Sequence, residues 1–259
     1  MTRVGVCGAA GRMGTEVCRT ISSADDLDLA AAIDPGAIGE SVADLAGIDS
    51  DIQVVASLDE AGDLDVVVDF THIDSARANM SWCADHGIHA VVGTSGFSES
   101  DLDGLRAAFT DSNCVIAPNF AIGAVLMMRF AELAVPHFES AEIIEFHHDN
   151  QVDAPSGTAV STAERMAAAS ADWIEDPTTI DTIPGARGAI GPAGIPIHGV
   201  RMRGMVAHQE VVLGTTGQTL TIRHDTTDRT SFMPGVLIAV RAIADHQGVT
   251  LGLDPFLGL

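Results

Sequence analysis

Hydrophobic residues in the first half of the chain gather in short runs, and stretches with helical spacing separate them. The runs that predict buried strands are Val4–Cys7, Leu29–Ile33, Val66–Asp69, Ala90–Val92 and Cys114–Ala117. The helical stretches between them end near Ile21 or span Ala76–Ala84 and Leu102–Phe109. Repeated strand–helix–strand units of this length predict a parallel, doubly wound sheet, because parallel strands need a crossover connection.

The pattern changes after Asn119, where longer strands with alternating polar positions appear. Helices are predicted at Ile122–Ala134, Thr158–Ala169 and Val236–Ala244, and strands at Ala141–Phe146, Ile197–Met202, Ala207–Leu213 and Thr219–His224. Ile174–Pro196 is rich in Pro, Gly and Thr and predicts a long loop. We therefore expect a dinucleotide-type domain over residues 1–120 and a smaller α+β domain on an antiparallel or mixed sheet over 121–232. A C-terminal helix of about 233–259 is expected to return to the first domain.

The charge of the chain narrows the classes of partner. Its 259 residues carry a formal net charge of -23, and all 13 basic residues are Arg, with no Lys. Nucleic acid and anionic membranes need positive charge at the contact, so neither is expected as a partner. Salt screens repulsion between like charges, which favours a protein of a high-salt cytoplasm. The alternative is an ordinary acidic protein with solvated faces. The N-terminal segment enters a strand without a basic stretch or cleavage site, which favours a cytoplasmic protein.

A glycine-rich turn follows the first predicted strand and opens a helix. Its residues are Gly8, Ala9, Ala10, Gly11, Arg12, Met13 and Gly14. Glycines allow the backbone to approach a pyrophosphate, and the helix N-terminus supplies free N–H groups. Asp34 ends the second strand at the position where an acidic residue binds the ribose of NAD. The alternatives are a plain strand-to-helix turn and an Asp-Pro-Gly turn.

No Arg lies directly beside Asp34 to hold a 2′-phosphate, so NADH is mildly favoured over NADPH. Arg12 lies within the turn and has a side chain long enough to reach a phosphate, so use of both cofactors stays open. Two other strand ends, Asp69–His72 and Gly93–Phe97, carry Gly and hydroxyl residues. Ligands of doubly wound sheets bind at the carboxyl ends of the strands, so this cluster is expected near the cofactor.

The segment from Glu145 to Thr158 holds several candidate catalytic and binding residues. In it a strand ends, a polar loop follows, and a helix begins near Ser156. Histidine is the residue type whose charge changes near neutral pH, so His147 and His148 are both candidate proton donors. Free N–H groups at the start of the helix are suited to a carboxylate. Two alternatives stay open: surface histidines, or a metal site that includes Asp149 or Asp153.

Together these motifs resemble the 4-hydroxy-tetrahydrodipicolinate reductase (dihydrodipicolinate reductase) family. The resemblance rests on the Gly8–Gly14 turn, Gly93–Phe97, Ala117–Phe120, the loop Glu145–Thr158, Gly199–Gly214 and Arg229–Phe232. It implies a Rossmann-type doubly wound parallel sheet with a second α+β domain built on a mixed sheet. It also implies NAD(P)H-dependent reduction of a small cyclic dicarboxylate, 4-hydroxy-tetrahydrodipicolinate, in lysine and diaminopimelate biosynthesis, by a homotetramer and without a metal.

The resemblance further implies a role for each matching residue. His147 is the proton donor, and His148, Gly157 and Thr158 hold the substrate. The residues implied to hold the nicotinamide cofactor are Gly8, Ala9, Ala10, Gly11, Arg12, Met13, Asp34, Gly93, Thr94, Ser95, Ala117, Pro118, Asn119 and Phe120.

One position departs from the family pattern. Gln151 stands where the family usually has a Lys, and a neutral amide cannot donate a proton as an acid, although it can donate hydrogen bonds to a carboxylate. His147 is then left as the acid, or Arg201, Arg203 or Arg229 replaces the missing charge. The departure keeps two alternatives open: a related Rossmann-type dehydrogenase acting on another amino or keto acid, and a non-catalytic nucleotide-binding homologue.

Overall fold

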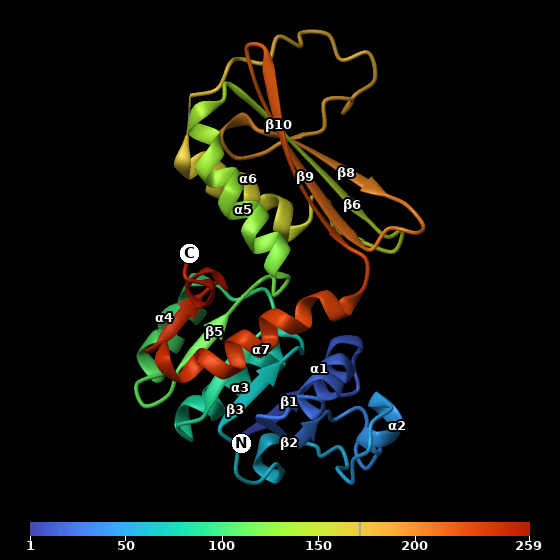
Figure 1. Ribbon diagram of the computed structural model, residues 1–259, viewed down its shortest axis with the longest axis vertical. Coiled ribbons are helices and arrows are strands. Elements are labelled where there is room, and N and C mark those ends of the chain that lie inside the picture. The colour runs from blue at the N-terminus through green and yellow to red at the C-terminus, as the bar shows by residue number, and fades with distance from the viewer. Residues whose placement is uncertain (171) are drawn as a thin grey trace. The chain divides into compact units, whose positions relative to one another are not determined.

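The computed structural model describes residues 1–170 and 172–259, which divide into two compact units. The first unit comprises Met1–Phe120 and Phe232–Leu259, and the second comprises Ala121–Ser231 (Figure 1). The C-terminal segment therefore packs with the first unit, although residues 121–231 separate it from Phe120 in the sequence.

The first unit is built on a six-stranded sheet in the order β11-β5-β4-β3-β1-β2, with every pairing parallel. Its strands are β1 (Thr2–Cys7), β2 (Leu27–Ile33), β3 (Val66–Asp69), β4 (His89–Val92), β5 (Cys114–Ile116) and β11 (Val249–Leu251). Its helices are α1 (Arg12–Ser22), α2 (Val42–Ala46), α3 (Ile73–Asp85), α4 (Glu99–Ala108) and α7 (Met233–Ala242). The doubly wound, Rossmann-type sheet expected from the sequence is confirmed.

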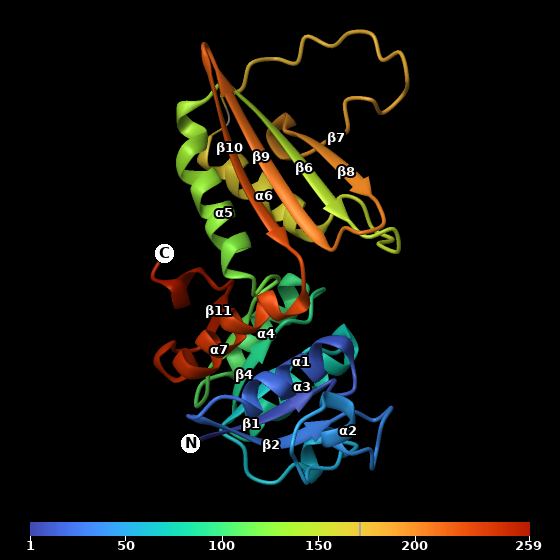
Figure 2. The same ribbon diagram turned by 45° about the vertical axis from the view of Figure 1, so that its right-hand side comes forward.

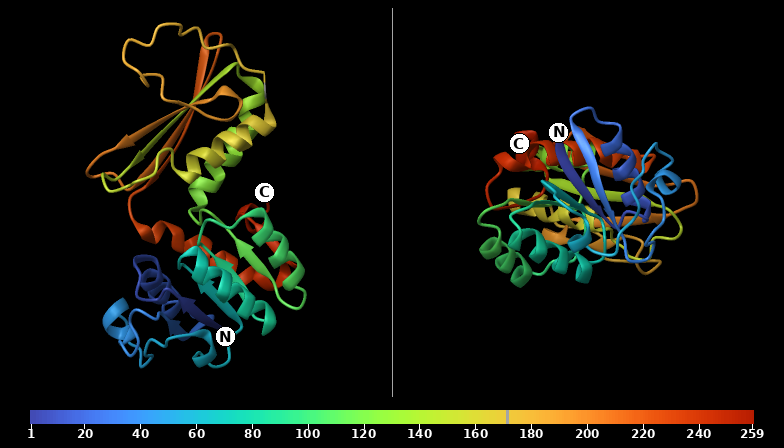
Figure 3. Two further views of the ribbon diagram at one scale, coloured as in Figure 1. Left: turned by 180° about the vertical axis from the view of Figure 1, so that it is seen from behind. Right: turned by 90° about the horizontal axis from the view of Figure 1, so that it is seen from below.

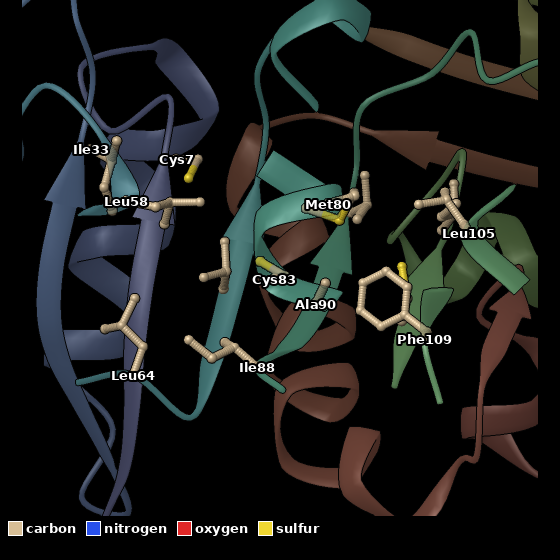
Figure 4. Close-up of a cluster of buried hydrophobic side chains, with 14 of the residues drawn as sticks. Cys7, Ile33, Leu58, Leu64, Met80, Cys83, Ile88, Ala90, Leu105 and Phe109 are labelled. Carbon is tan, nitrogen blue, oxygen red and sulfur yellow. The ribbon is translucent and has the colours of Figure 1, made fainter. Parts of the chain in front are cut away.

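Apolar side chains cover both faces of this sheet, as a parallel sheet requires. All four residues of β3 are buried. On one face, Met80 and Cys83 of α3 and Leu105 of α4 pack against strand residues such as Ala90 (Figure 4). On the other face lie α1 and α7, whose buried residues include Val17 and Val236 (Figure 1). Acidic residues stand at the carboxyl ends of two strands, since Asp34 follows β2 and Asp69 ends β3.

The second unit is built on a mixed sheet in the order β10-β9-β6-β8-β7. Its strands are β6 (Ser140–His147), β7 (Ala189–Ile190), β8 (Pro196–Arg201), β9 (Ala207–Thr215) and β10 (Gln218–Thr226). Strands β6 and β8 run parallel, whereas β6–β9, β9–β10 and β7–β8 are antiparallel. Helices α5 (Ile122–Ala134) and α6 (Gly157–Ala169) cover one face, where Ala131 and Met166 pack on Ile143 and Val211 (Figure 2).

Several elements differ from the sequence-based expectation. The predicted loop 174–196 contains the two-residue strand β7 and a 3-10 turn at Pro192–Gly194, while 172–188 is an open loop (Figure 3). The helix expected over about 233–259 ends at Ala242, and β11 beyond it pairs with β5. Helix α2 was not predicted. Elements of two to five residues contain too few positions for a periodic pattern, so only tertiary pairing reveals them. No described helix is long and apolar enough to cross a membrane.

Candidate functional site

The glycine-rich turn between β1 and α1 has the shape that a phosphate site needs. Gly8 has a φ of +78°, and a Cβ there would lie 2.6 Å from the Phe70 carbonyl oxygen. A Cβ at Gly14 would lie 2.0 Å from the Gly8 carbonyl oxygen. Side chains would therefore force the turn apart. Helix α1 begins after Gly11, which offers no side chain to cap its N–H groups, so the helix N-terminus is suited to an anion.

Asp34 lies at the end of β2 and is tied to this turn. Its Oδ2 accepts a hydrogen bond from the backbone N–H of Ala10 at 3.1 Å, and Oδ1 accepts one from Gly36 N–H at 2.9 Å. A carboxylate has about four acceptor positions, so lone pairs are left for ribose hydroxyls. The structure thus brings the predicted ribose-binding residue next to the predicted phosphate turn.

A buried polar network joins the ends of β3 and β4. Asp69 is fully buried, and its Oδ1 accepts hydrogen bonds from the hydroxyls of Thr71 and Thr94, both at 2.8 Å. Its Oδ2 accepts one from Asn79 of α3 at 2.7 Å. A buried carboxylate is tolerated only with such partners. The network therefore holds Thr94, a predicted cofactor residue, in place.

The backbone of Gly93 lies directly against the ring of Phe70. A Cβ at Gly93 would lie 2.0 Å from this ring, and the Phe70 ring lies 5.8 Å from that of Phe120, centroid to centroid. Ala117 donates its N–H to Val92 at 3.0 Å. The segments 93–95 and 117–120, predicted from separate motifs, therefore lie at neighbouring strand ends.

In the second unit, His147 is the last residue of β6, and its side chain is only 15% exposed. Its Nδ1 pairs with Oε2 of Glu145, whose side chain is fully buried. Oε1 of Glu145 accepts a hydrogen bond from Nη2 of Arg201 on β8 at 2.8 Å. Burial raises the pKa of Glu145, but the hydrogen bonds from His147 and Arg201 outweigh it and hold the pKa below its ordinary value. Glu145 is therefore ionised at neutral pH.

The loop after His147 runs into the N-terminus of α6. Ser156 is buried and caps the helix by accepting a hydrogen bond from Ala159 N–H at 3.3 Å. Gly157 is exposed, and no atom lies within 4 Å of the place where its Cβ would be. The first turn of α6 is therefore open on this side to a carboxylate, as at other helix N-termini.

The polar and charged side chains around the loop form hydrogen bonds and ion pairs with one another. Gln151 donates to Asp153, and Nε of Arg203 pairs with Asp149 at 2.8 Å while the Arg203 side chain remains 93% exposed. Arg201 donates from Nη2 to the Asp153 carbonyl oxygen at 2.6 Å, besides its bond to Glu145. Of the Arg residues considered as replacements for the family Lys, Arg203 is the exposed one beside the loop.

The predicted site residues thus form two groups, one in each unit. The turn, Asp34, 93–95 and 117–120 gather at the carboxyl ends of the first sheet, and His147, His148, Gln151, Gly157 and Thr158 lie along one loop. Sequence reasoning did not assign Glu145 or Asn79 a role, and it considered Arg201 only as a replacement for the charge of the family Lys. Burial and distant partners identify them, and the acidic residue in the Glu-x-His-His sequence was the one available signal.

Comparison with known proteins covers nearly the whole chain. Residues 2–120 match the family model described as "Dihydrodipicolinate reductase, N-terminus", and residues 123–257 match "Dihydrodipicolinate reductase, C-terminus". The chain is 49% identical over 265 residues to 4-hydroxy-tetrahydrodipicolinate reductase of Corynebacterium urealyticum, with 100% of both chains covered. It is 49% identical over 263 residues to the enzyme of the same name from Nocardia farcinica, with 99% of both covered.

Solved structures agree with these matches. Dipicolinate-bound dihydrodipicolinate reductase from Paenisporosarcina sp. TG-14 is 36% identical, with a TM-score of 0.86 over 98% of this chain and 99% of that one. An amine dehydrogenase from Mycobacterium smegmatis shares the fold alone, at 13% identity and a TM-score of 0.66 over 96% of this chain and 94% of that one. On the family models and the full-length relatives, this chain belongs to the dihydrodipicolinate reductase family.

Proposed function

We propose that this protein catalyses the NAD(P)H-dependent reduction of 4-hydroxy-tetrahydrodipicolinate to tetrahydrodipicolinate, a step of lysine and diaminopimelate biosynthesis. The full-length relatives carry the name of this reaction. In the net reaction a hydride and a proton are added to the substrate and one water is lost. The alternative of an unrelated amino or keto acid substrate is not favoured by these relatives.

The observation that carries the proposal is the loop from His147 to the N-terminus of α6. It puts a histidine that is paired on Nδ1 in the same loop as the open start of α6 at Gly157, where the Ser156 cap accepts a hydrogen bond from Ala159 N–H. Such a helix start binds a carboxylate, and a histidine supplies a proton at neutral pH. A cyclic dicarboxylate that is protonated during reduction needs both. A solved relative with dipicolinate bound supports a small dicarboxylate ligand.

The residues of the first unit fit a nicotinamide dinucleotide. The turn Gly8–Met13 would hold the pyrophosphate, because side chains at Gly8 or Gly14 would fill the cradle. Asp34 would hold the adenosine ribose, and Gly93–Ser95 with Ala117–Phe120 would line the nicotinamide half. When bound, the cofactor supplies the hydride.

The residues of the second unit supply binding and the proton. His147 would donate the proton from its Nε2 as general acid, a role that contributes about 10²–10⁴-fold to a rate. His148 and Gln151 would donate hydrogen bonds to substrate carboxylates, and Gly157 and Thr158 would bind one carboxylate with backbone N–H groups.

Cofactor preference, assembly and environment belong to the same proposal. Asp34 favours NADH, because its carboxylate binds ribose hydroxyls and repels a 2′-phosphate.

A homotetramer joined through sheets of the second unit is supported by the edge position of β10, where Leu220 is 38% exposed. A net charge of -23 without Lys supports a cytoplasm of high salt.

The test identifies the product as well as the rate. The substrate is generated from pyruvate and aspartate semialdehyde by the preceding synthase, and NADH is added with the protein in molar potassium chloride. The proposal predicts NADH oxidation and a product one oxygen atom lighter than the substrate by mass spectrometry. Cofactor binding without such a product would contradict it.

A further inference from the structure

A carboxylate buried beneath His147 has no part in the function as described so far. Glu145 precedes His147 by two residues on β6, so both side chains point to the same face of the sheet. Oε2 of Glu145 pairs with Nδ1 of His147, and neither atom has another hydrogen-bond partner among the described residues. Ionised side chains are almost never fully buried without a pairing role, because their desolvation is costly.

The surroundings of Glu145 are shaped to hold this carboxylate. Gly199 is the residue paired with Glu145 on β8, and a Cβ there would lie 3.0 Å from Oε1 of Glu145. Arg201, the next residue on the same face, donates from Nη2 to Oε1 at 2.8 Å. The same Nη2 donates to the Asp153 carbonyl oxygen at 2.6 Å. One guanidinium therefore holds both the carboxylate and the end of the His147 loop.

We propose that Glu145 is a positioning residue for His147: its carboxylate, held by Arg201, accepts the Nδ1–H of His147 and leaves Nε2 as the nitrogen that carries the transferable proton. This inference rests on the proposed function, in which His147 is the proton donor. Neutral imidazole carries its proton on one nitrogen only, so the partner of Nδ1 decides the role of Nε2.

Among the residues that the structure describes, Glu145 is the anionic side chain that pairs with His147. On β8 the residue paired with His147 is the cation Arg201, and on β9 it is the uncharged Ala207. The next β9 residue, His208, pairs with Asp225 of β10 at 2.7 Å. Gln209 lies opposite Glu145 and donates to Thr162 of α6 at 2.7 Å.

In the adjoining loop, Asp153 contacts Gln151 and Asp149 pairs with Arg203. The charges of Glu145 and Arg201 cancel, so a protonated His147 adds a single positive charge to a balanced pair.

Replacing the carboxylate by an amide should reverse the tautomer. Arg201 can only donate hydrogen bonds, so it would take the amide oxygen of Glu145→Gln. The amide N–H₂ would then face Nδ1, which must become an acceptor. Neutral His147 would carry its proton on Nε2, and the imidazolium that acts as the acid would be disfavoured.

Three variants distinguish a positioning role of Glu145 from a purely structural one. Glu145→Gln removes the charge with little change in shape, and Glu145→Asp keeps a carboxylate on a shorter side chain. Glu142→Gln is the matched control: on the same strand, Glu142 also pairs with an Arg and a His, Arg187 at 2.8 Å and His198 at 2.7 Å, and it lies on the opposite face of β6. Thermal melting and NADH binding would be measured for each, to show that the variant is folded.

The first readout is independent of activity. ¹⁵N chemical shifts of the His147 ring, assigned by comparison with His147→Ala, report which nitrogen carries the proton. We expect Nδ1–H in the unsubstituted protein, Nδ1–H in Glu145→Asp and Glu142→Gln, and Nε2–H in Glu145→Gln. A proton on Nε2 in the unsubstituted protein, or an unchanged tautomer in a folded Glu145→Gln, would overturn the proposal.

The second readout is the pH dependence of kcat and KM. Glu145→Gln should lower kcat by about 10²-fold with KM nearly unchanged, because the residue acts through His147 and not on the substrate. The alkaline limb of its kcat profile should move to lower pH, since less imidazolium is present at each pH. Glu145→Asp should recover part of kcat, and Glu142→Gln should match the unsubstituted protein. A rise in KM alone would contradict positioning.

The two proposals can fail separately. A protein that shows the expected tautomers but reduces no substrate would retain the Glu145 inference and refute the proposed function. An active reductase in which Glu145→Gln leaves both the tautomer and kcat unchanged would do the reverse.

Discussion

The backbone N–H of Ala10 donates a hydrogen bond to Oδ2 of Asp34 at 3.1 Å, which ties the end of β2 to the glycine-rich turn after β1. The hydrogen bond brings together two motifs that are 24 residues apart in sequence and that we propose to form one cofactor site. Asp34 therefore shapes the turn, in addition to the ribose-binding role that we propose for it.

Removing the charge at this position should change the cofactor preference. Asp34→Ser should raise the ratio of kcat/KM for NADPH to that for NADH by about tenfold or more, because a 2′-phosphate is no longer repelled. Asp28→Asn is the matched control, since Asp28 is exposed on the same strand and its loss should leave the ratio unchanged. A preference for NADPH in the unsubstituted protein would contradict the role given to Asp34.

Gln151 offers a test of substrate binding. Gln151→Lys should lower the substrate KM by about tenfold, because a charged hydrogen bond to a carboxylate contributes about 1.5–3 kcal/mol. The neighbouring exposed Asn150 provides the control, as Asn150→Lys adds the same charge one residue away. Equal effects of both variants would indicate general attraction of the dianion. A raised KM in Gln151→Lys would mean that the substrate carboxylate does not bind there.

The close packing of the glycine-rich turn leads us to expect that a substitution of Gly14 weakens cofactor binding. Gly14→Ala places a Cβ 2.0 Å from the Gly8 carbonyl oxygen, so the turn must shift. We expect weaker NADH binding and a loss of about 1–3 kcal/mol of stability, measured by titration and denaturant melting. Gly104→Ala, in the middle of α4 with open space around it, should instead stabilise the protein by about 0.5–1 kcal/mol. Unchanged NADH affinity in Gly14→Ala would contradict this use of the turn.

The hydrogen bonds at the start of α4 predict part of the loss of folding stability at low pH. Hydrogen bonds from Arg77, and from Ser98 at the helix start, hold the pKa of Asp101 well below its ordinary value. A carboxyl with a lowered folded-state pKa contributes stability above its unfolded pKa and loses it as pH falls through the folded value. Asp101→Asn should therefore lower the melting temperature at neutral pH and flatten its fall below about pH 4.

Asp103 supplies the control for that series. It lies on the same helix, its side chain is 76% exposed, and it forms an ion pair with Arg106 at 2.8 Å. Asp103→Asn should leave the acid limb of the melting profile almost unchanged. Identical profiles for Asp101→Asn and Asp103→Asn would refute the special role of the Asp101 cap.

Much of the fold was readable from the sequence, because buried parallel strands are continuous apolar runs. Val66–Asp69 was predicted with the bounds that β3 has in the structure. The three-residue strand β11 was missed, because Val249–Leu251 is too short for a pattern and becomes a strand only by pairing with β5.

The site was readable where its residues lie together in sequence. Gly8–Gly14 and Glu145–Thr158 are contiguous, so their chemistry is visible in one motif. The partnership of Glu145 with Arg201 spans 56 residues and depends on the register of β6 against β8, which no local pattern carries. The same holds for Asn79, whose bond to the buried Asp69 follows from the packing of α3 on β3.

The most direct test of the account compares the unsubstituted protein with His147→Ala in the synthase-coupled assay, at equal and saturating NADH in molar potassium chloride. We predict substrate-dependent NADH oxidation that falls by about 10²–10⁴-fold in His147→Ala while NADH binding is retained. Oxidation that is unaffected by the substitution, or absent from a folded protein that binds NADH, would contradict the central claim that His147 is the proton donor of a dicarboxylate reductase.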